Sequence, residues 1–332
     1  MPVIDMHSHM IPPGIVEAIE REPATFAAQI KGAGTQRSVV HQQGYTYPLF
    51  EEFTHPEVKL AVMEQKGLDI SVISPAPPLF YYWADKTLGV RVARLVNDGI
   101  AELVASHPQR LQGMASVPMQ DTEAAIAELE RVVSTYGFRG VEIGTTIEGE
   151  SLAHPRFRPF FRRAAELDVL VFTHPYYVGS KQGMEDYYLT NLIGNPLDTT
   201  IMLAHLFFSG MLDELPTLKL CIAHAGGFAP YQIGRLAHGY NVRAETHANA
   251  RTSPLELLRR LTFDTLTFHP PALRYLIDLV GANHIMLGSD APFDMGDSDP
   301  VGTVATIPAL NEQERTAILT NTAVTMLGIT AP

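Results

Sequence analysis

The chain has 332 residues, of which 46% are hydrophobic and 18% are charged, and its mean hydropathy is +0.04. This composition excludes an intrinsically disordered chain and is sufficient for a large hydrophobic core. Lysine and arginine number 24 against 36 aspartates and glutamates, so the formal net charge is -12. A uniformly basic surface for nucleic acid or an anionic membrane is therefore excluded.

Short apolar runs rich in β-branched residues alternate along the chain with longer amphipathic stretches. Strands are expected at residues 3–7, 70–74, 112–117, 140–145, 169–174, 219–224, 261–264 and 285–290. Helices are expected at residues 56–66, 85–105, 121–136, 155–166, 196–215, 228–242, 271–280 and 311–327. Asp121 is a favourable N-cap for the third of these helices.

Eight strand–helix units predict an α/β fold with a parallel sheet. We expect the sheet to close into a single (β/α)8 TIM barrel that spans residues 1–332. An open doubly wound sheet is the alternative, but the first expected strand is not followed by a glycine-rich dinucleotide loop. Residues 32–52 are polar and are expected to form an insert or lid after the first strand, not a second domain.

The N-terminal segment lacks the basic and apolar regions of a secretory signal. No stretch approaches the roughly 18 consecutive apolar residues of a membrane-spanning helix. The single cysteine, Cys221, cannot form an intrachain disulfide, which favours a reducing compartment. We therefore expect a cytoplasmic protein without membrane or nucleic-acid partners.

Four of the expected strands end in a side chain that could bind a metal ion or carry a proton. His7 and His9 end the first strand, His174 the fifth, His224 the sixth and Asp290 the eighth. The carboxyl ends of the strands of a parallel barrel all lie on one face, where active sites are built. We therefore expect these residues to meet, although nearly the whole chain separates the first from the last.

The spacing of His7 and His9 favours a metal site, because residues two apart in a strand point to the same side. A third imidazole and a carboxylate complete a mixed nitrogen and oxygen site that suits Zn²⁺ or another divalent metal. Each residue alone has an ordinary explanation, such as a loop residue, a turn cap or a core histidine. Their occurrence together at strand ends of one barrel favours the metal site.

These motifs resemble the amidohydrolase superfamily. The segments IDMHSH at 4–9, AHAGG at 223–227 and LGSDAPF at 287–293, with the His174 strand end between them, occur in the order of that superfamily. The resemblance extends from Asp5 to the C-terminal helix. It is greatest to the branch that contains 2-amino-3-carboxymuconate 6-semialdehyde decarboxylase, through residues 107–121, residues 215–227 and Gly234-Arg235.

The resemblance implies that His7, His9, His174 and Asp290 bind one catalytic divalent metal ion, usually zinc, with manganese as the alternative. It implies that His224 activates metal-bound water or supplies a proton, with assistance from Asp290. Many two-metal relatives carry a bridging lysine in the fourth strand, where this chain has residues 140–144 without a lysine. This difference favours a single metal ion.

The resemblance also implies that Arg235 binds a substrate carboxylate, in a neighbouring subunit of a dimer. A second arginine that the decarboxylase carries in the insert is absent from residues 44–49. Tyr176 and Trp83 are expected to contact a planar substrate, within an aromatic group that also contains Tyr81, Tyr82, Tyr177, Tyr187 and Tyr188. The alternative for these aromatic residues is a hydrophobic loop cluster or a subunit interface.

The activity that the resemblance implies is metal-dependent decarboxylation of a conjugated or aromatic carboxylate, in the catabolism of aromatic compounds by a homodimer or higher homo-oligomer. The alternative is a metal-dependent hydrolase of a C–C, lactone, ester or amide bond. Both reactions need a metal ion, a base and a group that binds an anion, so these residues do not separate them. A hydratase or a non-catalytic binding barrel is less favoured, since a binding module does not need an activated water.

Overall fold

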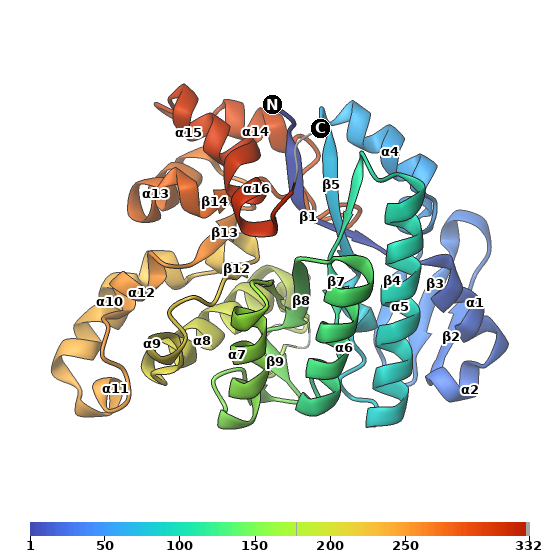
Figure 1. Ribbon diagram of the computed structural model, residues 1–332, viewed down its shortest axis with the longest axis horizontal. Coiled ribbons are helices and arrows are strands. Elements are labelled where there is room, and N and C mark those ends of the chain that lie inside the picture. The colour runs from blue at the N-terminus through green and yellow to red at the C-terminus, as the bar shows by residue number, and fades with distance from the viewer. Residues whose placement is uncertain (177, 330–332) are drawn as a thin grey trace.

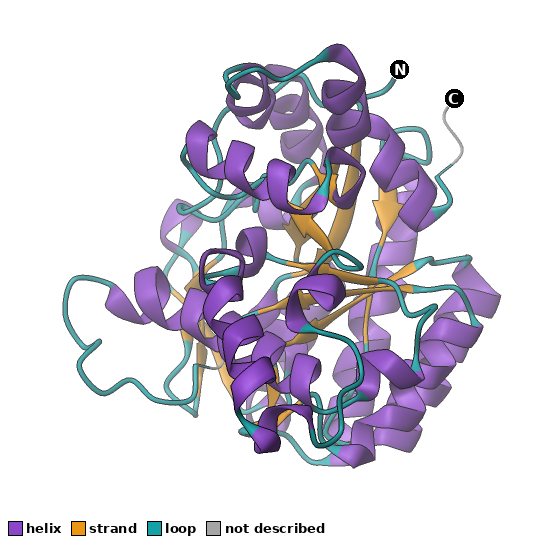
Figure 2. Ribbon diagram, turned by 90° about the vertical axis from the view of Figure 1, so that its left-hand side faces the viewer, coloured by secondary structure: helices purple, strands orange, loops and turns teal. Residues whose placement is uncertain are grey.

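The computed structural model describes residues 1–176 and 178–329, so Tyr177 lies outside the described residues. Strands form the centre of the molecule and helices surround them (Figures 1 and 2). The helices α5 (Lys86–Ser106), α6 (Thr122–Tyr136) and α7 (Arg158–Glu166) follow one another around the outside of the strands (Figure 1). This arrangement is that of a TIM barrel.

The barrel strands occur at the positions that the sequence predicts. They are β1 (Ile4–Met10), β5 (Ile70–Pro75), β6 (Leu111–Gly113) with β7 (Ala115–Ser116), β8 (Gly140–Gly144), β11 (Leu170–His174), β12 (Leu220–Ile222), β13 (Thr262–Asp264) and β14 (Ile285–Met286). Successive strands pair in parallel. Because β6 and β7 are separated only by Met114, they form the third of eight strand positions.

The barrel closes where the chain beyond β14 meets β1. The Met6 amide donates to the Leu287 carbonyl at 2.9 Å, and the His9 amide donates to the Ala291 carbonyl at 2.8 Å. These bonds join the first strand to the last, so the eight-stranded barrel is confirmed and the open sheet is wrong.

Several helices cover the strands or cap the barrel. Besides α5, α6 and α7 they are α8 (Asn195–Phe208), α9 (Met211–Glu214), α10 (Ala229–Val242), α11 (Ala244–His247), α12 (Pro254–Leu258), α13 (Pro270–Val280), α14 (Pro300–Ala305), α15 (Glu312–Thr316) and α16 (Thr322–Leu327). The side chain of Asp121 accepts a hydrogen bond from the Ala124 amide at 2.8 Å, as expected of an N-cap. The helix expected at residues 196–215 is instead two helices, because Gly210 adopts a positive φ of 76° between them.

The interior of the barrel is apolar below the strand ends and polar at them. Ile4 and Met6 of β1 pack with Phe172, Cys221 and Met286 in one buried cluster. The pairing of β1 with β5 shifts by one residue between Asp5 and Ser8, which is a β-bulge. The bulge changes the alternation of side chains along β1, so both Met6 and the following His7 and His9 face the interior.

Between β1 and α4 (Pro56–Gln65) the chain leaves the barrel. It forms α1 (Pro13–Arg21), α2 (Pro23–Phe26), a three-stranded antiparallel sheet and α3 (Glu51–Thr54). The strands of this sheet are β2 (Ala28–Lys31), β3 (Ser38–His41) and β4 (Thr46–Pro48).

Among the described residues, no helix is both long enough and apolar enough to cross a bilayer.

Candidate metal centre

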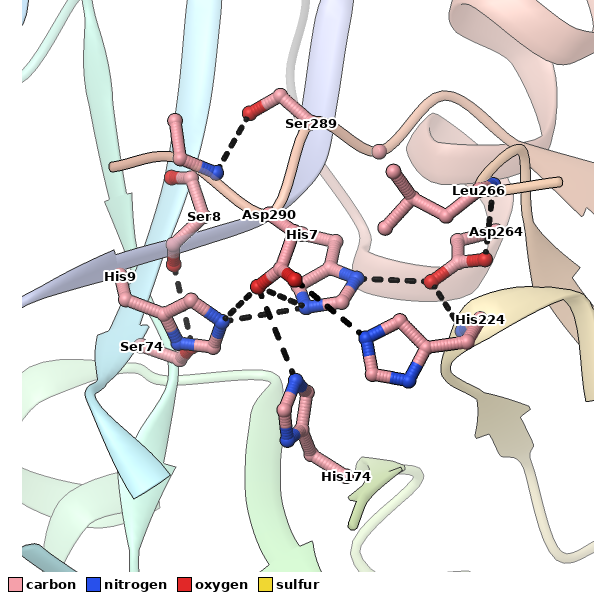
Figure 3. Close-up of polar contacts among 12 residues, drawn as sticks. His7, Ser8, His9, Ser74, His174, His224, Asp264, Leu266, Ser289 and Asp290 are labelled. Atoms are coloured by element: carbon pink, nitrogen blue, oxygen red, sulfur yellow. Dashed lines mark hydrogen bonds and ion pairs between the residues drawn. The ribbon is translucent and has the colours of Figure 1, made fainter. Parts of the chain in front are cut away.

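Four side chains from three barrel positions converge at the carboxyl ends of the strands (Figure 3). His7 Nε2 lies 3.1 Å from His9 Nε2, and both nitrogens face Asp290 Oδ1, at 3.3 Å and 3.1 Å. His174 Nε2 lies 3.8 Å from the same oxygen. All four residues are buried, and one ligand atom from each lies within 4.8 Å of the others. These residues form a metal-binding cluster.

Hydrogen bonds at the far side of two imidazoles orient their Nε2 atoms toward the centre. His7 Nδ1 lies 2.7 Å from Asp264 Oδ2. His9 Nδ1 lies 3.1 Å from Ser74 Oγ and 3.3 Å from the Pro75 carbonyl. A proton on each Nδ1 leaves a lone pair on each Nε2. In metal-binding histidines, a hydrogen-bond acceptor at one ring nitrogen fixes this tautomer and leaves the other nitrogen free to bind the metal.

His174 supplies an independent test of whether a metal ion fits. It is 5% exposed, and neither of its ring nitrogens has a hydrogen-bond partner within the described parts of the chain. A buried polar atom without a partner is costly. A cation bound at the cluster removes this cost for Nε2, which points toward the cluster (Figure 3). Three nitrogen donors and one carboxylate are a donor set suited to a divalent ion.

The charges and pKa values of the cluster residues favour binding of a positively charged ion. Burial would raise the pKa of Asp290, but the neighbouring histidines, His7 above all, hold it well below the usual range. Burial lowers the pKa of His9 to about 4 and that of His174 to about 3. Burial also acts to lower the pKa of His7, yet the charges of Asp290 and Asp264 outweigh it and raise this pKa to about 10. The centre therefore combines an ionised carboxylate with two unprotonated imidazoles, those of His9 and His174, while His7 holds a proton that a bound cation would displace.

A buried hydrogen-bond network holds the backbone around Asp290, which adopts a positive φ of 56°. Such a conformation costs about 1–3 kcal/mol for a residue other than glycine and persists only where neighbours enforce it. The Ser289 hydroxyl donates to Asp5 Oδ2 at 2.6 Å, and the Ser289 amide donates to Asp5 Oδ1 at 3.0 Å. The buried ammonium of Lys59 donates to the Ala291 carbonyl at 3.4 Å and to Glu52 Oε1 at 3.2 Å.

Gly288, two residues before Asp290, permits a close approach in the same region. A Cβ atom at this position would lie 2.9 Å from the Cβ of His7 and 3.0 Å from that of Asp264. Real Cβ atoms do not approach so closely, so a side chain at position 288 would displace a ligand or its partner.

His224 lies beside the cluster and is less buried than its members, with 17% of its side chain exposed. Its Nε2 lies 3.4 Å from Asp290 Oδ2. Asp264 accepts hydrogen bonds from the amides of His224 and Ala225 at 2.8 Å and 2.7 Å. These bonds hold both residues at positive φ values of 53° and 52°. The same Asp264 carboxylate therefore positions His224 and orients His7.

A cavity of about 550 Å³ opens above the cluster and includes His174, His224 and Asp290 in its wall. Most of the remaining wall is aromatic or apolar. The described lining comprises Thr46, Tyr47, Pro48, Phe50, Pro77, Pro78, Pro175, Tyr176, Tyr188, Asn191, Leu192, Asn195, Pro196, Gly227, Phe228, Leu266, Thr267, Phe268, Ala272, Phe293, Asp294 and Met295.

The structure brings together only part of the site that the sequence predicts. Tyr176 lines the cavity, but neither Trp83 nor Arg235 belongs to its described lining. Trp83 packs against Tyr81 at 4.7 Å and His41 at 5.8 Å between ring centroids. Arg235 is exposed on α10. Substrate contacts by these two residues stay predictions.

Three buried residues that sequence reasoning missed contribute to the centre. Asp264 is a carboxylate at the end of the seventh strand, and this position is the signal that could have indicated it. Glu142 lies inside the barrel, 3.9 Å from His9 Nδ1, and its burial raises its pKa to about 8. Lys59 is 1% exposed. A lysine on an expected helix carries no sequence signal of burial, because lysines usually face solvent.

The family model for amidohydrolases matches residues 4–329, and the chain belongs to this family. It is 34% identical over 275 residues to 2-amino-3-carboxymuconate-6-semialdehyde decarboxylase of Dictyostelium discoideum, covering 82% of this chain and 77% of that protein. It is 28% identical over 348 residues to 2-keto-4-carboxy-3-hexenedioate hydratase of a Sphingobium species, covering 96% of this chain and 94% of that protein.

A solved structure has a similar fold. Dihydroxybenzoic acid decarboxylase of a Polaromonas species, with bound manganese and the inhibitor 2-nitroresorcinol, superposes with a TM-score of 0.81 at 21% identity. The match covers 98% of this chain and 96% of that chain.

Proposed function

We propose that this protein is a metal-dependent decarboxylase of a conjugated or aromatic carboxylate. The observation that carries the proposal is a buried cluster of three histidines and one aspartate in the wall of a cavity lined mostly by aromatic and other apolar side chains, with His224 beside it. The flat faces of aromatic and proline side chains suit a planar substrate. Relatives named as decarboxylases of conjugated and aromatic acids support this choice.

His7, His9, His174 and Asp290 would hold one divalent ion, zinc or manganese. Four ligands suffice for a single ion, and the fourth strand, residues 140–144, contains no lysine that could bridge two ions. Manganese is supported by the Polaromonas structure and zinc by the three imidazole ligands. When bound, the ion would supply a Lewis acid for substrate oxygen atoms.

His224 is proposed to carry the proton. Its Nε2 is near Asp290 and its side chain reaches the cavity, where a substrate carbon can meet it. His224 protonates the carbon that bears the carboxylate, and the C–C bond to the carboxylate then breaks. The electron pair of that bond returns to the conjugated system and CO₂ leaves. Solvent restores the proton on His224, and Asp290 keeps the imidazole aligned.

The segment at residues 32–52 is proposed to act as a lid. Thr46, Tyr47, Pro48 and Phe50 from this segment line the cavity. Tyr45 contacts the ring of Tyr176, with 5.6 Å between the two centroids. Closure by these side chains would exclude water from the reacting carboxylate.

A homodimer is proposed to bring Arg235 of the partner subunit to the cavity. Arg235 is exposed on α10 and lies outside the described cavity lining, so it cannot be assigned to the cavity of its own chain. Large hydrophobic side chains are exposed on the same helix and on neighbouring segments: Tyr187, Tyr188, Leu192, Ile193, Leu197, Ile201, Phe228, Tyr231, Val242, Phe268 and Tyr275. Exposed apolar surface of this kind marks interaction sites. Arg235→Lys would then raise KM for the carboxylate about tenfold or more.

The location is proposed to be the cytoplasm. Support comes from the single cysteine, Cys221, which is buried and free.

The test is a product assay on the protein loaded with Mn²⁺ or Zn²⁺. A panel of hydroxybenzoates and conjugated dienoic acids is incubated with it, and CO₂ and the organic product are both measured. We expect one CO₂ for each substrate consumed. His224→Ala is expected to keep its metal content and to lower kcat by about 10²–10⁴-fold. His107→Ala, which changes a histidine before β6 and outside the cavity lining, is the control.

Hydration is the second candidate, because the Sphingobium relative is named as a hydratase. A product that has gained one water, without CO₂, would establish it and overturn the decarboxylase proposal. Release of a new acid from an ester, lactone, amide or C–C substrate, again without CO₂, would establish a hydrolase.

A further inference from the structure

The insert at residues 32–52 contacts the barrel through a buried histidine. His41, the last residue of β3, is only 2% exposed although its strand lies outside the barrel. Its ring packs against Tyr81 and Trp83, which lie between β5 and α5, with 4.9 Å and 5.8 Å between ring centroids. We call Tyr81 and Trp83 the aromatic socket. The ring of His41 therefore docks the insert on the barrel.

The aromatic socket is fixed in shape by the residues around it. Tyr81 and Trp83 pack on each other with 4.7 Å between their ring centroids. Tyr81 adopts a positive φ of 52°, which a residue other than glycine keeps only where its neighbours enforce it. The side-chain amide of Gln120 provides this restraint, because it donates to the carbonyls of Tyr81 at 3.1 Å and Ala84 at 3.3 Å.

His41 also contacts the wall of the cavity through Tyr47 on the neighbouring strand β4. The two ring centroids are 5.6 Å apart, and Tyr47 lines the cavity that includes His174 and His224. The strands β3 and β4 pair antiparallel, with Val39 opposite Tyr47. Because the two strands form one small sheet, departure of His41 from the aromatic socket would displace Tyr47 as well.

We propose that His41 is a positioning residue that, in its uncharged form, holds Tyr47 in the wall of the cavity. The inference rests on the lid role proposed for residues 32–52 and does not depend on which reaction the enzyme catalyses. His41 lies outside the described lining of the cavity, so it acts through Tyr47. A phenyl ring would dock in the same way at any pH, whereas an imidazole makes the docking depend on its charge.

The surroundings of His41 offer nothing that would stabilise a charged imidazole. Over the described residues, neither of its ring nitrogens has a hydrogen-bond partner. The titratable groups in ring contact with it are the phenols of Tyr47 on β4 and Tyr81 between β5 and α5. The attraction of aromatic faces for a cation is smaller than the cost of burying an unpaired charge. Burial accordingly lowers the pKa of His41 from 6.5 to about 4, and no carboxylate opposes this shift.

The sign of the pH dependence follows from this depressed pKa. An undocked His41 has the higher pKa, so it takes up a proton first as the pH falls, and protonation favours the undocked state. The docking equilibrium is therefore fully retained above pH 6.5 and weakens by about tenfold for each pH unit between 6.5 and 4. Between pH 7.5 and pH 4.5 the total loss is roughly 50-fold.

Hydrogen exchange of the insert measures this equilibrium. The His41 amide donates to the Tyr45 carbonyl at 2.8 Å, and this bond must open before the amide exchanges. The metal-loaded protein is compared at pH 7.5 and pH 4.5 through the protection factor of a peptide that covers residues 38–48. We expect the protection factor of the wild type to fall roughly 50-fold more than that of His41→Phe, which fills the aromatic socket without titrating.

Comparison with variants separates His41 from the rest of the molecule. Effects of acid on the metal-binding histidines occur equally in the wild type and in His41→Phe, so the difference between the two excludes them. If His41→Phe does not fold, His41→Gln provides a second uncharged side chain with the same expectation. His55→Phe is the matched control, because His55 is exposed between α3 and α4 and should leave the wild-type pH dependence in place.

Steady-state kinetics at pH 7.5 test the connection from His41 to the cavity. His41→Ala empties the aromatic socket, and we expect it to raise KM about tenfold for any substrate that the enzyme converts, without loss of bound metal. His41→Phe should restore KM to near the wild-type value. Rescue by a ring that has no nitrogen would show that docking, and not proton transfer by His41, supports binding at this pH.

Two results would overturn the inference. A protection factor that is independent of pH in the wild type, or that falls equally in His41→Phe, would show that the charge of His41 does not control docking. A normal KM for His41→Ala would remove the connection to Tyr47. Hydrogen exchange requires no turnover, so an enzyme that releases no CO₂ would end the decarboxylase proposal and leave the exchange test of His41 intact.

Discussion

The carboxylate of Asp264 illustrates how one residue can serve two parts of a site. It accepts hydrogen bonds from four groups: His7 Nδ1 and the amides of His224, Ala225 and Leu266. Burial acts to raise its pKa, but the hydrogen bond and charge of His7 outweigh this and lower it. An ionised carboxylate can accept all four bonds, whereas an amide cannot.

Asp264→Asn is expected to disturb His7 and His224 together. The side-chain nitrogen of the new asparagine would face one of the N–H groups that now donate to the carboxylate. That hydrogen bond is lost, and the N–H group is left without an acceptor. We expect the affinity for Zn²⁺ or Mn²⁺ to fall about 10–100-fold, the usual effect of losing a hydrogen-bond partner of a metal-binding histidine. Competition with a chelator measures this affinity. Asp278→Asn, which alters a surface ion pair of α13, is the control. An unchanged affinity would contradict the positioning role.

His7→Ala is expected to lose bound metal and activity together. This substitution removes one of three imidazoles from the cluster, and His9, His174 and Asp290 alone leave the ion incompletely held. Elemental analysis of the desalted protein should give about one metal ion per wild-type chain and far less in the variant. A wild-type chain that holds two ions, or a variant that holds one, would argue against this ligand set.

The helix α4 contributes to the centre although it lies outside the barrel. The ammonium group of Lys59 on this helix donates a hydrogen bond to the carbonyl of Ala291, the residue after Asp290. The same ammonium group forms an ion pair with Glu52 of α3. A buried ammonium is expensive unless it is paired and hydrogen-bonded. The two contacts satisfy this requirement and join α3, α4 and the chain after β14.

Lys59→Met removes this tether while retaining an apolar stem of similar length. We expect metal affinity to fall about tenfold, since the backbone around Asp290 loses one of its supports. The matched control is Lys66→Met. Lys66 donates to the Asp297 carbonyl at 3.0 Å, in the same chain segment, whereas Lys59 donates to the carbonyl of Ala291, the residue that follows Asp290. Equal effects of the two variants would show that Lys59 acts only through general stability.

Across the whole molecule, the sequence predicted the features that depend on local patterning. Eight strands and the His7, His9, His174 and Asp290 cluster followed from periodicity and from the common face of the strand ends. Lys59 and Glu142 did not, because their burial depends on tertiary packing and not on the residues beside them. The division of residues 196–215 into two helices depended on the conformation of a single glycine, Gly210.

Metal binding should stabilise the entire fold, because the cluster joins the first strand to the chain after the last. A ligand present at about 100 times its dissociation constant adds about 2.7 kcal/mol to the free energy of unfolding. For a chain of this size that corresponds to a rise in Tm of about 4 °C. Calorimetry with added metal and then with excess chelator measures the difference. His7→Ala should show no such shift, and an equal shift in the variant would place the stabilising ion elsewhere.

The closure of the barrel through the metal-binding residues also has a consequence for how the protein is made. His9 and Asp290 are 281 positions apart in the chain. During translation, which proceeds at about 5–20 residues per second, the first two histidines leave the ribosome well before Asp290 is synthesised. A growing or truncated chain can therefore present imidazoles but cannot assemble the complete cluster. Tight retention of the ion thus reports that a full-length chain has folded.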